Sequence, residues 1–320
     1  MHNPVQLQEI IEKAISKIHY PQHPANLYEP IRYIMNLGGK RIRPVMVLMA
    51  SELFNDDVNI ALDVALAIET FHNFTLVHDD IMDNAPLRRG AQTVHEKWGS
   101  NTAILSGDVM MVESNKHLSK VKLNVLKPVL DTFNATAQGV CEGQQLDMEF
   151  EQRSDVSIDE YLEMIRLKTA VLLGGAIKLG AIVGGATEEN AELLYNFGEN
   201  LGVAFQLQDD ILDVYGNPEK FGKQVGGDII ANKKTFLHLK ALKLAQNDEA
   251  ILLISENLNP ETKVERVTSL YNKYEIKQLA TAEMEKHLSL AKEALMNLAV
   301  EDQKKANFRA LVQQILEREH

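Results

Sequence analysis

The sequence predicts an all-α protein built as one large domain over residues 1–320. Apolar residues recur at intervals of three and four along almost the whole chain, which is the spacing of one helix face. The alternating pattern of half-buried strands is missing. The breaks between periodic stretches are short and are not rich in Pro, Gly and Ser, so none of them resembles an interdomain linker.

The expected helices follow one another with recognisable stop signals. The first carries an apolar stripe and is closed by Pro21 and Pro24, because a proline ring cannot continue a helix interior. The second starts near Ala25 and ends at Gly38-Gly39. Further helices are expected at 57–84, 101–118, 123–150, 158–183, 188–214 and 234–247, with more after 260. The first half of 57–84 is apolar on most sides, which is typical of a helix inside a bundle.

Composition and charge exclude several classes of protein. Hydrophobic residues make up 45% and charged residues 24%, so the chain is globular and not disordered. A net charge of −12 argues against a general nucleic-acid binder. The lone Cys141 cannot form an internal disulfide, so we expect the protein to reside in a reducing compartment. We also expect the Cys141 side chain to be buried as a small apolar residue. The N-terminus lacks a leader pattern and no uninterrupted apolar run reaches 18 residues, so we expect a soluble, cytoplasmic protein.

Two of the expected helices carry the pattern Asp-Asp-x-x-Asp. The members are Asp79, Asp80 and Asp83 in the first and Asp209, Asp210 and Asp213 in the second. Residues four apart share a helical face, so each helix brings two carboxylates to one point. Like charges at this spacing repel unless a cation lies between them. Carboxylate ligands suit a hard ion such as Mg²⁺, which commonly shares its shell with substrate phosphates.

A single triplet is most simply a solvated acidic face. Two triplets are a different matter: with 17 aspartates in 320 residues, chance gives about 0.05 matches per chain and about 0.001 for a pair. Basic residues also flank both triplets. They are Lys40, Arg41, Arg43, Arg88 and Arg89 around the first and Lys223, Lys233 and Lys234 after the second. A diphosphate is multiply charged and needs such neutralisation from several sides, so the pattern predicts a diphosphate site.

At these residues the sequence resembles the trans-prenyl diphosphate synthases, the family of farnesyl, geranylgeranyl and longer-chain polyprenyl diphosphate synthases. The matching stretches, in order, are Gly38–Pro44, His72, Asp79–Asp83, Leu87–Gly90, Gly107-Asp108, Gly143-Gln144 with Asp147, Lys168-Thr169, Phe205–Asp213 and Gly222–Lys233. The resemblance implies a single bundle of mostly antiparallel helices around a deep central cavity, the isoprenoid synthase type, usually as a homodimer. It also implies a prenyltransferase that condenses isopentenyl diphosphate head-to-tail with an allylic diphosphate by Mg²⁺-assisted ionisation.

The resemblance implies a role for each matching residue. Three Mg²⁺ ions, which Mn²⁺ can replace, would be bound by Asp79, Asp83 and Asp209, with Asp80, Asp210 and Asp213 in supporting positions. The allylic diphosphate would be held by Arg88, Lys168, Lys223 and Lys233, and isopentenyl diphosphate by Lys40, Arg43, His72 and Arg89. Thr169 and Gln206 would place oxygen dipoles near the allylic cation and act with Lys168 in catalysis. The released pyrophosphate would take the final proton.

Product length is expected to depend on Phe74 and Thr75. In the family the growing chain extends past the residues just before the first aspartate motif. Phe74 lies about 7.5 Å and some 140° around the helix from Asp79, so helical geometry alone does not place its ring in the cavity. One aromatic residue with a small neighbour favours geranylgeranyl diphosphate (C20). Farnesyl diphosphate (C15), a product of about C25 and a merely structural Phe74 remain open.

Three other classes of protein compete with this interpretation. Glu69 and His72 form a Glu-x-x-His pattern, and two such patterns would indicate a di-iron carboxylate bundle. Glu317 and His320 repeat this spacing, but that class leaves the basic clusters unexplained. A terpene cyclase would normally replace the second aspartate triplet with a different metal motif. A non-catalytic helical scaffold or regulatory subunit would be expected to have lost some of the metal and diphosphate residues.

Overall fold

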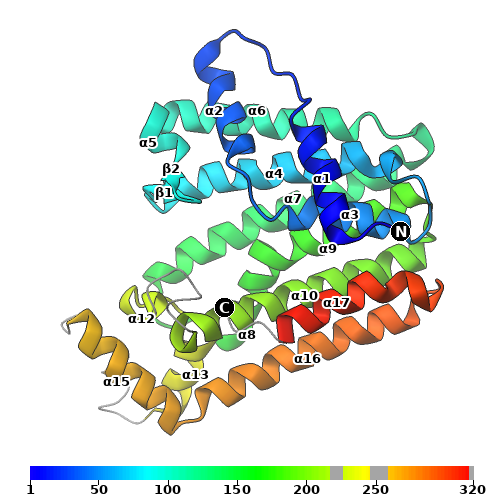
Figure 1. Ribbon diagram of the computed structural model, residues 1–320. Helices are drawn as coiled ribbons and strands as arrows, with labels where there is room; N and C mark the ends of the chain where they lie inside the picture. The colour runs from blue at the N-terminus through cyan, green and yellow to red at the C-terminus, as the bar shows by residue number, and fades with distance from the viewer. Residues whose placement is uncertain (217–225, 246–258, 317–320) are drawn as a thin grey trace. The chain divides into compact units, whose positions relative to one another are not determined.

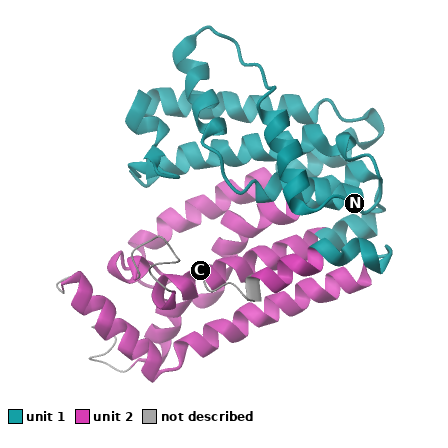
Figure 2. Ribbon diagram, in the orientation of Figure 1, with its two compact units in different colours: residues 1–134, 176–194, 299–307 teal, residues 135–175, 195–298, 308–320 magenta. Residues whose placement is uncertain are grey.

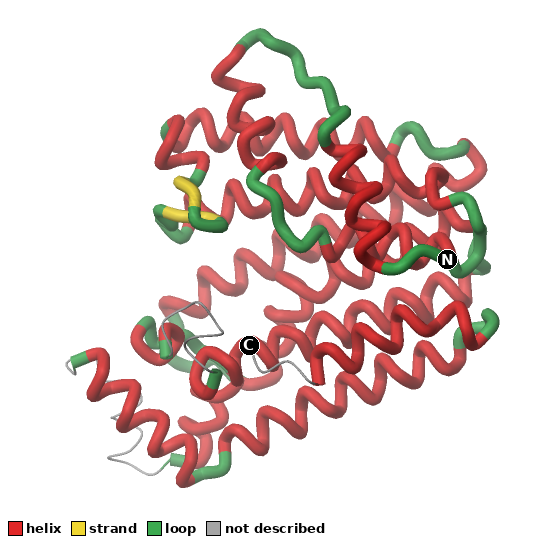
Figure 3. The backbone as a smooth tube through the Cα atoms, in the orientation of Figure 1, coloured by secondary structure: helices red, strands yellow, loops and turns green. Residues whose placement is uncertain are grey.

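The computed structural model describes residues 1–216, 226–245 and 259–316, and in these residues the chain is almost entirely helical (Figures 1 and 3). The prediction of an all-α fold is confirmed. The described strands are two short ones, β1 (Leu87–Arg88) and β2 (Ala91–Gln92), paired antiparallel. Arg89 and Gly90 join them, both with positive φ, as a two-residue hairpin turn requires. Strands of two residues leave no alternating pattern for the sequence to show.

The helices gather into two compact units (Figure 2). Unit 1 contains Met1–Asn134, Ala176–Leu194 and Ala299–Asn307. Unit 2 contains Ala135–Gly175, Tyr195–Leu298 and Phe308–His320. Helices α7 (Leu123–Gln152), α9 (Val171–Gly184), α10 (Glu188–Tyr215) and α17 (Ala306–Leu316) contribute residues to both. The single domain over 1–320 and its central cavity stay predictions.

Unit 1 is organised around α4 (Leu62–Met82), which follows a 3₁₀ turn, η1 (Val58–Ala61). Helices that pack on α4 include α1 (Pro4–Ile15), α2 (Ala25–Asn36), α3 (Ile42–Glu52), α5 (Val94–Trp98) and α6 (Ser100–Leu118). Helix α7 also contacts α4, through the edge-on packing of Phe133 against Phe71. Helix α6 runs beside α4 in Figure 1. Residues 64–71 are buried on all sides, as expected for a helix inside a bundle.

Helix α3 was not foreseen as an element of its own. Every residue from Pro44 to Glu52 is buried, so the stretch carries no apolar stripe that alternates with polar positions. A helix of this kind cannot be distinguished from another short apolar run by periodicity.

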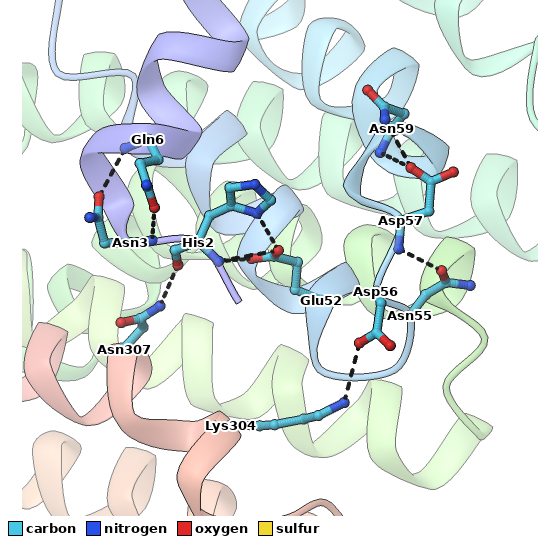
Figure 4. Close-up of polar contacts among 10 residues, drawn as sticks. All are labelled: His2, Asn3, Gln6, Glu52, Asn55, Asp56, Asp57, Asn59, Lys304 and Asn307. Carbon is cyan, nitrogen blue, oxygen red and sulfur yellow. Dashed lines mark hydrogen bonds and ion pairs between the residues drawn. The ribbon is translucent and has the colours of Figure 1, made fainter.

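A polar cluster ties the start of α1 to the end of α3 (Figure 4). The backbone N–H of His2 donates to both carboxylate oxygens of Glu52, and the His2 ring nitrogen Nδ1 lies 2.6 Å from Oε1. The Nδ2 of Asn307 donates to the carbonyl of His2 at 3.0 Å, which brings the segment 299–307 into unit 1. Buried Glu52 therefore has partners that compensate its burial.

Unit 2 contains α8 (Ile158–Ile165), a π-helical turn η2 (Arg166–Ala170), α12 (Gly227–Ile230), α13 (Phe236–Leu244), α15 (Pro260–Lys273) and α16 (Ile276–Asn297). A capping box between Ser157 and Glu160 starts α8. The ring of Phe197 packs edge-on against Phe308 at 5.4 Å between centroids. The expected helix at 158–183 is α8, η2 and α9 in succession, and no residue pattern predicted the π turn.

Two helical stretches are long and apolar enough to cross a membrane by length and composition, Val58–Met82 and Ile158–Gly184. In each, 61% of the apolar window is buried inside the protein. Such burial is typical of core helices in a soluble protein. Cys141 is exposed, which corrects the expectation that it would be buried.

Candidate active site

The first aspartate triplet lies at the C-terminal end of α4. Asp79 and Asp83 are one turn apart, and Asp83 caps the helix. Asp80 points into the protein and is buried. The Arg88 side chain, on β1, donates to Asp80 Oδ1 from Nε at 2.8 Å and from Nη2 at 2.5 Å, and Nη2 lies 3.6 Å from Asp79 Oδ2. The hairpin thus holds an arginine against the triplet.

Burial and charge oppose each other at this contact. Burial raises the pKa of Asp80, and the hydrogen bonds and charge of Arg88 only partly offset that effect. For Arg88, burial lowers the pKa, but the bond to Asp80 and the charges of Asp80, Asp79 and Asp83 outweigh it and raise the pKa. Arg88 stays charged beside three carboxylates.

The stretch GGKRIRP forms the loop before α3 and the first turn of that helix. Arg41 is buried in a left-handed conformation, with φ at 47°. Its Nε donates to Glu12 at 2.8 Å, its Nη1 to Glu69 at 2.5 Å and its Nη2 to the carbonyl of Met35 at 2.7 Å. Burial lowers the pKa of Arg41, but the bonds to Glu12 and Glu69 outweigh this and raise the pKa. Arg41 therefore fixes the loop to α1, α2 and α4.

The arginines next to this loop meet at His72. Arg43 Nη1 donates to His72 Nε2 at 3.2 Å. Burial and then the charges of Arg43, Arg89 and Arg88 lower the pKa of His72 well below its usual value, so the ring is neutral and accepts. Arg89 donates to the carbonyl of Gly38, and Lys40 is exposed on the loop. The four residues predicted to hold isopentenyl diphosphate are Lys40, Arg43, His72 and Arg89, and all belong to unit 1.

Phe74 sits within a row of aromatic rings on α4. Its ring lies edge-on to His78, with 4.7 Å between centroids, and 5.6 Å from Phe71. His78 Nε2 lies 3.2 Å from the carbonyl of Ile104 on α6. A Cβ added to Gly107 would come within 2.3 Å of that same nitrogen, so the glycine makes room for the imidazole. The Thr75 hydroxyl donates to the carbonyl of His72 at 2.8 Å.

The second aspartate triplet lies near the end of α10 in unit 2. Asp210 is buried and accepts from the hydroxyl of Tyr161 on α8 and from Gln206 Nε2 at 3.3 Å. Burial raises the pKa of Asp210 to about 7, with the charge of Asp228 adding to the rise. Asp209 and Asp213 are only partly buried. The backbone N–H of Asp228 donates to Asp213 Oδ2 at 3.0 Å, so Asp213 holds the start of α12.

Lys168 and Thr169 lie on the π turn. Lys168 Nζ donates to Asp147 Oδ2 on α7 at 2.5 Å. A Cβ added to Gly143 would come within 2.1 Å of the Lys168 backbone nitrogen, so only a glycine lets the two backbones approach so closely. Thr169 is partly buried. A π turn of this kind is frequent at functional sites.

Two lysines remain among the residues predicted to hold the allylic diphosphate. Lys233 is exposed, with Nζ 3.7 Å from Asp228 Oδ1. Lys223 lies outside the described residues. The structure thus links Lys233 to Asp213 through Asp228, whereas Lys223 keeps its predicted role without a described position.

The donor atoms fit a divalent cation. Among the described residues no three His, Cys, Asp or Glu side chains form a metal-binding group. Each aspartate pair alone supplies carboxylate oxygens, the ligands that Mg²⁺ prefers. The buried Oδ2 of Asp80 has no hydrogen-bond partner in the described part of the chain, nor has Nε of Arg43. The first of these atoms can accept from a cation-bound water and the second can donate to an anion, so the residues present fit both kinds of ligand.

Sequence reasoning missed several contributors. Tyr161 and Glu12 had no motif, because a single Tyr or Glu on an amphipathic helix looks like any packing or surface residue. Asp147 and Asp228 stood within the matching stretches but received no role. The spacing of Asp147 after Gly143-Gln144 was the signal that could have found it, since Gly143 and Asp147 share a face of α7.

Comparison with known proteins points to one family. The sequence profile described as polyprenyl synthetase matches residues 24–274. A geranylgeranyl diphosphate synthase of Methanosarcina mazei is 42% identical over 236 residues, covering 73% of this chain and 72% of that protein. A short chain isoprenyl diphosphate synthase of Methanothermobacter thermautotrophicus is 39% identical over 317 residues, 98% of this chain and 95% of that one. A crystal structure of a geranylgeranyl pyrophosphate synthase matches with a TM-score of 0.95 at 39% identity, covering 100% of both chains.

Proposed function

The chain belongs to the polyprenyl synthetase family, and we propose on this premise that it lengthens an allylic diphosphate to geranylgeranyl diphosphate. It is a prenyltransferase with an all-α fold. The substrates of the proposed reaction are isopentenyl diphosphate and an allylic diphosphate, joined head-to-tail. The observation that carries the proposal is the ion pair of Arg88 with Asp80 in the first aspartate triplet. At the second triplet, Asp213 accepts from the backbone N–H of Asp228, whose carboxylate lies 3.7 Å from Lys233 Nζ.

We propose Mg²⁺ as the cation, three per active site, with Asp79, Asp83 and Asp209 as direct ligands. When bound, the cations neutralise the diphosphate and favour its departure from the allylic carbon. Asp80 holds Arg88 in place, Asp210 anchors α10 to Tyr161, and Asp213 holds α12. In this arrangement the three supporting carboxylates orient neighbouring groups, as second-layer partners commonly do.

The basic residues divide into two groups by their contacts. Arg43 and Arg89 surround neutral His72 with positive charge, which suits a diphosphate that is held but not broken. We assign isopentenyl diphosphate to this group together with Lys40. Lys168, fixed by Asp147, is assigned with Arg88, Lys223 and Lys233 to the departing allylic diphosphate. Thr169 and Gln206 then stabilise the cation as it forms.

The assignment of a C20 product rests on Phe74. Its ring is held edge-on by His78, which is itself fixed against α6. Because the Phe74 ring packs between His78 and Phe71, its rotation is restricted, as a barrier to chain growth requires. Farnesyl diphosphate and a product of about C25 are the alternatives.

The experiment is product analysis. Purified protein is incubated with isopentenyl diphosphate, Mg²⁺ and dimethylallyl, geranyl or farnesyl diphosphate, and the dephosphorylated products are identified by mass spectrometry. We expect C20 alcohol to dominate with every primer. A dominant product of another length would overturn the length assignment, and no product with any primer would overturn the reaction.

We also propose that the protein is a cytoplasmic homodimer. Helix α6 exposes Ile104, Leu105 and Val112 on one face, and such an apolar face is typical of a surface that another chain covers. Light scattering on the purified protein tests this, with Leu105→Lys expected to favour the monomer. A wild-type monomer at micromolar concentration would contradict it.

A further inference from the structure

Unit 1 contains a cleft of about 650 Å³ that the proposed reaction does not use. It lies between α1, the start of α4 and the end of α6. Asp63 of the cleft is 16 residues before Asp79 on the continuous helix α4, which places it about 24 Å away along the helix axis. The cleft therefore lies well apart from the aspartate motif at the other end of α4.

Four lysines line this cleft, in two pairs at helical spacing. Lys13 and Lys17 are four residues apart on α1 and just after it, and Lys116 and Lys120 repeat that spacing at the end of α6. Residues four apart share a helical face, so each pair presents two ammonium groups together. In a chain of net charge −12 this is a local reversal of sign.

The two lysines of α6 are occupied by carboxylates of the cleft. Lys116 Nζ donates to Glu113 at 2.6 Å, and Lys120 Nζ donates to Asp63 Oδ1 at 2.9 Å. Asp63 also contacts His117 Nδ1 at 2.9 Å. The ammonium groups of Lys13 and Lys17 make no hydrogen bond or ion pair with any residue in the described part of the chain. They leave the cleft with two uncompensated positive charges.

The floor of the cleft is apolar. Ile10, Ala14 and Ile18 follow one another at intervals of four along α1 and the turn after it, and Leu62 and Leu66 face the cleft from α4. Each free lysine is followed in sequence by a member of this stripe, Lys13 by Ala14 and Lys17 by Ile18. Charge and apolar surface thus lie side by side on one helix. The volume lies in the range of small-molecule sites, and here an apolar floor lies beneath a mostly polar and charged rim.

We propose that this cleft binds an amphiphilic phosphate: a phosphate or diphosphate ester whose head pairs with Lys13 and Lys17 and whose hydrocarbon chain lies on Ile10, Ala14 and Ile18. A phosphate group without a hydrocarbon chain would leave the apolar floor of the cleft exposed to water. An uncharged lipid would form no ion pair with Lys13 or Lys17. The chemistry is shared by free alkyl phosphates and by the headgroups of anionic phospholipids.

Binding is measured by calorimetry on the full chain in EDTA, with decyl phosphate as the probe and with inorganic phosphate and decanol as its two halves. We expect decyl phosphate to bind at least about tenfold more tightly than either half. Lys13→Gln with Lys17→Gln should weaken it about tenfold or more, the loss typical of a charge-assisted hydrogen bond. Ala14→Phe, which fills the cleft without changing charge, should weaken it as well.

A matched control removes two exposed lysines that do not line the cleft, Lys243→Gln with Lys292→Gln, and should bind decyl phosphate like the wild type. Equal affinity in the wild type and the Lys13/Lys17 variant would overturn the proposal. Flotation with phosphatidylcholine vesicles, with and without phosphatidic acid, distinguishes the sources of the phosphate. Binding that needs phosphatidic acid and both lysines identifies a membrane lipid, and binding of decyl phosphate alone identifies a free ester. None of these measurements needs turnover, so they are independent of the proposed reaction.

Discussion

The guanidinium of Arg41 and the carboxylate of Glu69 form an ion pair closed off from water, with side chains only 1% and 2% exposed. Oε1 of Glu69 also accepts from Asn73 Nδ2 at 3.0 Å. Glu69 is the acidic member of the Glu-x-x-His pattern that a di-iron bundle would have used. Because this carboxylate is already committed to Arg41 and Asn73, the di-iron alternative loses its ligand. The pair instead anchors the loop that carries Lys40 and Arg43.

Replacing Arg41 should destabilise the protein strongly. Arg41→Ala strands the carboxylate of Glu69 in the interior, and breaking a buried pair in this way costs about 3–5 kcal/mol of unfolding free energy. Urea denaturation followed by circular dichroism measures it. Arg153→Ala serves as the control, since Arg153 pairs with Asp155 and Glu160 on the surface, where water and salt screen the charges and the pairs contribute little to stability. Similar losses for both variants would refute the anchoring role.

Turnover should depend on divalent cations and on both aspartate motifs. Activity is expected to vanish in EDTA and to return with Mg²⁺ or Mn²⁺. Asp79→Ala and Asp209→Ala should each lower kcat by orders of magnitude while the far-ultraviolet spectrum stays helical, because each removes a ligand that stabilises the transition state by several kcal/mol. Full activity in EDTA would contradict the mechanism.

The two groups of basic residues should separate in kinetics. Arg43→Ala is expected to raise KM for isopentenyl diphosphate, because it removes a charged donor worth about 1.5–3 kcal/mol. Lys168→Ala should chiefly lower kcat, since its charge is needed as the allylic diphosphate departs. Steady-state rates with each substrate varied in turn decide the matter. An unchanged KM for isopentenyl diphosphate in Arg43→Ala would overturn that assignment.

Product length should respond to Phe74. Phe74→Ala removes the ring that His78 holds and opens a void about the size of benzene, so products are expected to lengthen by one or more isoprene units. Mass spectrometry of the dephosphorylated products gives the distribution. The matched control is Phe197→Leu, which alters a fully buried ring that packs on Phe308 and not on Phe74, and it should leave the length unchanged. A wild-type distribution from an active Phe74→Ala enzyme would remove Phe74 as the barrier.

His238 should make stability fall in acid. Burial on α13, with the charges of Lys234 and Lys263, lowers its pKa from 6.5 to about 4. The unfolded chain therefore binds the proton more readily than the native one. Neutral His238 therefore does not lower the free energy of unfolding above pH 6.5. As pH falls from 6.5 towards 4, protonation of the unfolded chain lowers that free energy by about 3 kcal/mol in total. Urea midpoints of His238→Gln between pH 7 and 4.5 should fall less than those of the wild type or of His19→Gln, an exposed histidine. If the urea midpoints of His238→Gln and the wild type fall equally with pH, the role of His238 is contradicted.

Much of the fold could be predicted because most helices show one buried and one exposed face. The expected second helix began near Ala25, where α2 begins, and the stretch 57–84 contains η1 and α4. Helix α3 could not be predicted in this way, since its burial leaves no contrast between faces. The hairpin at Arg88 was missed because it depends on two positive φ angles and not on an alternating pattern.

The candidate site was predictable where function concentrates residues of one kind in a short stretch, as in the two aspartate triplets. The supporting contacts were not. Glu12 and Arg41 are 29 residues apart, and Tyr161 and Asp210 are 49 apart, and no local spacing relates such partners. Only the folded chain shows that Arg88 is held by Asp80, or that Asp147 fixes Lys168.

The π turn at Arg166–Ala170 makes the length of this stretch matter as much as its composition. A substitution there changes one side chain, but a deletion of one residue would let the turn relax into ordinary α-helix. Because a π turn holds one residue more than an α turn, α8 and α9 would keep nearly their present orientation, and only the side chains of the turn itself would be redistributed. Lys168 would then leave the position from which it contacts Asp147. In evolutionary terms, this segment can lose a residue without disturbing the helices on either side, but not without moving its lysine.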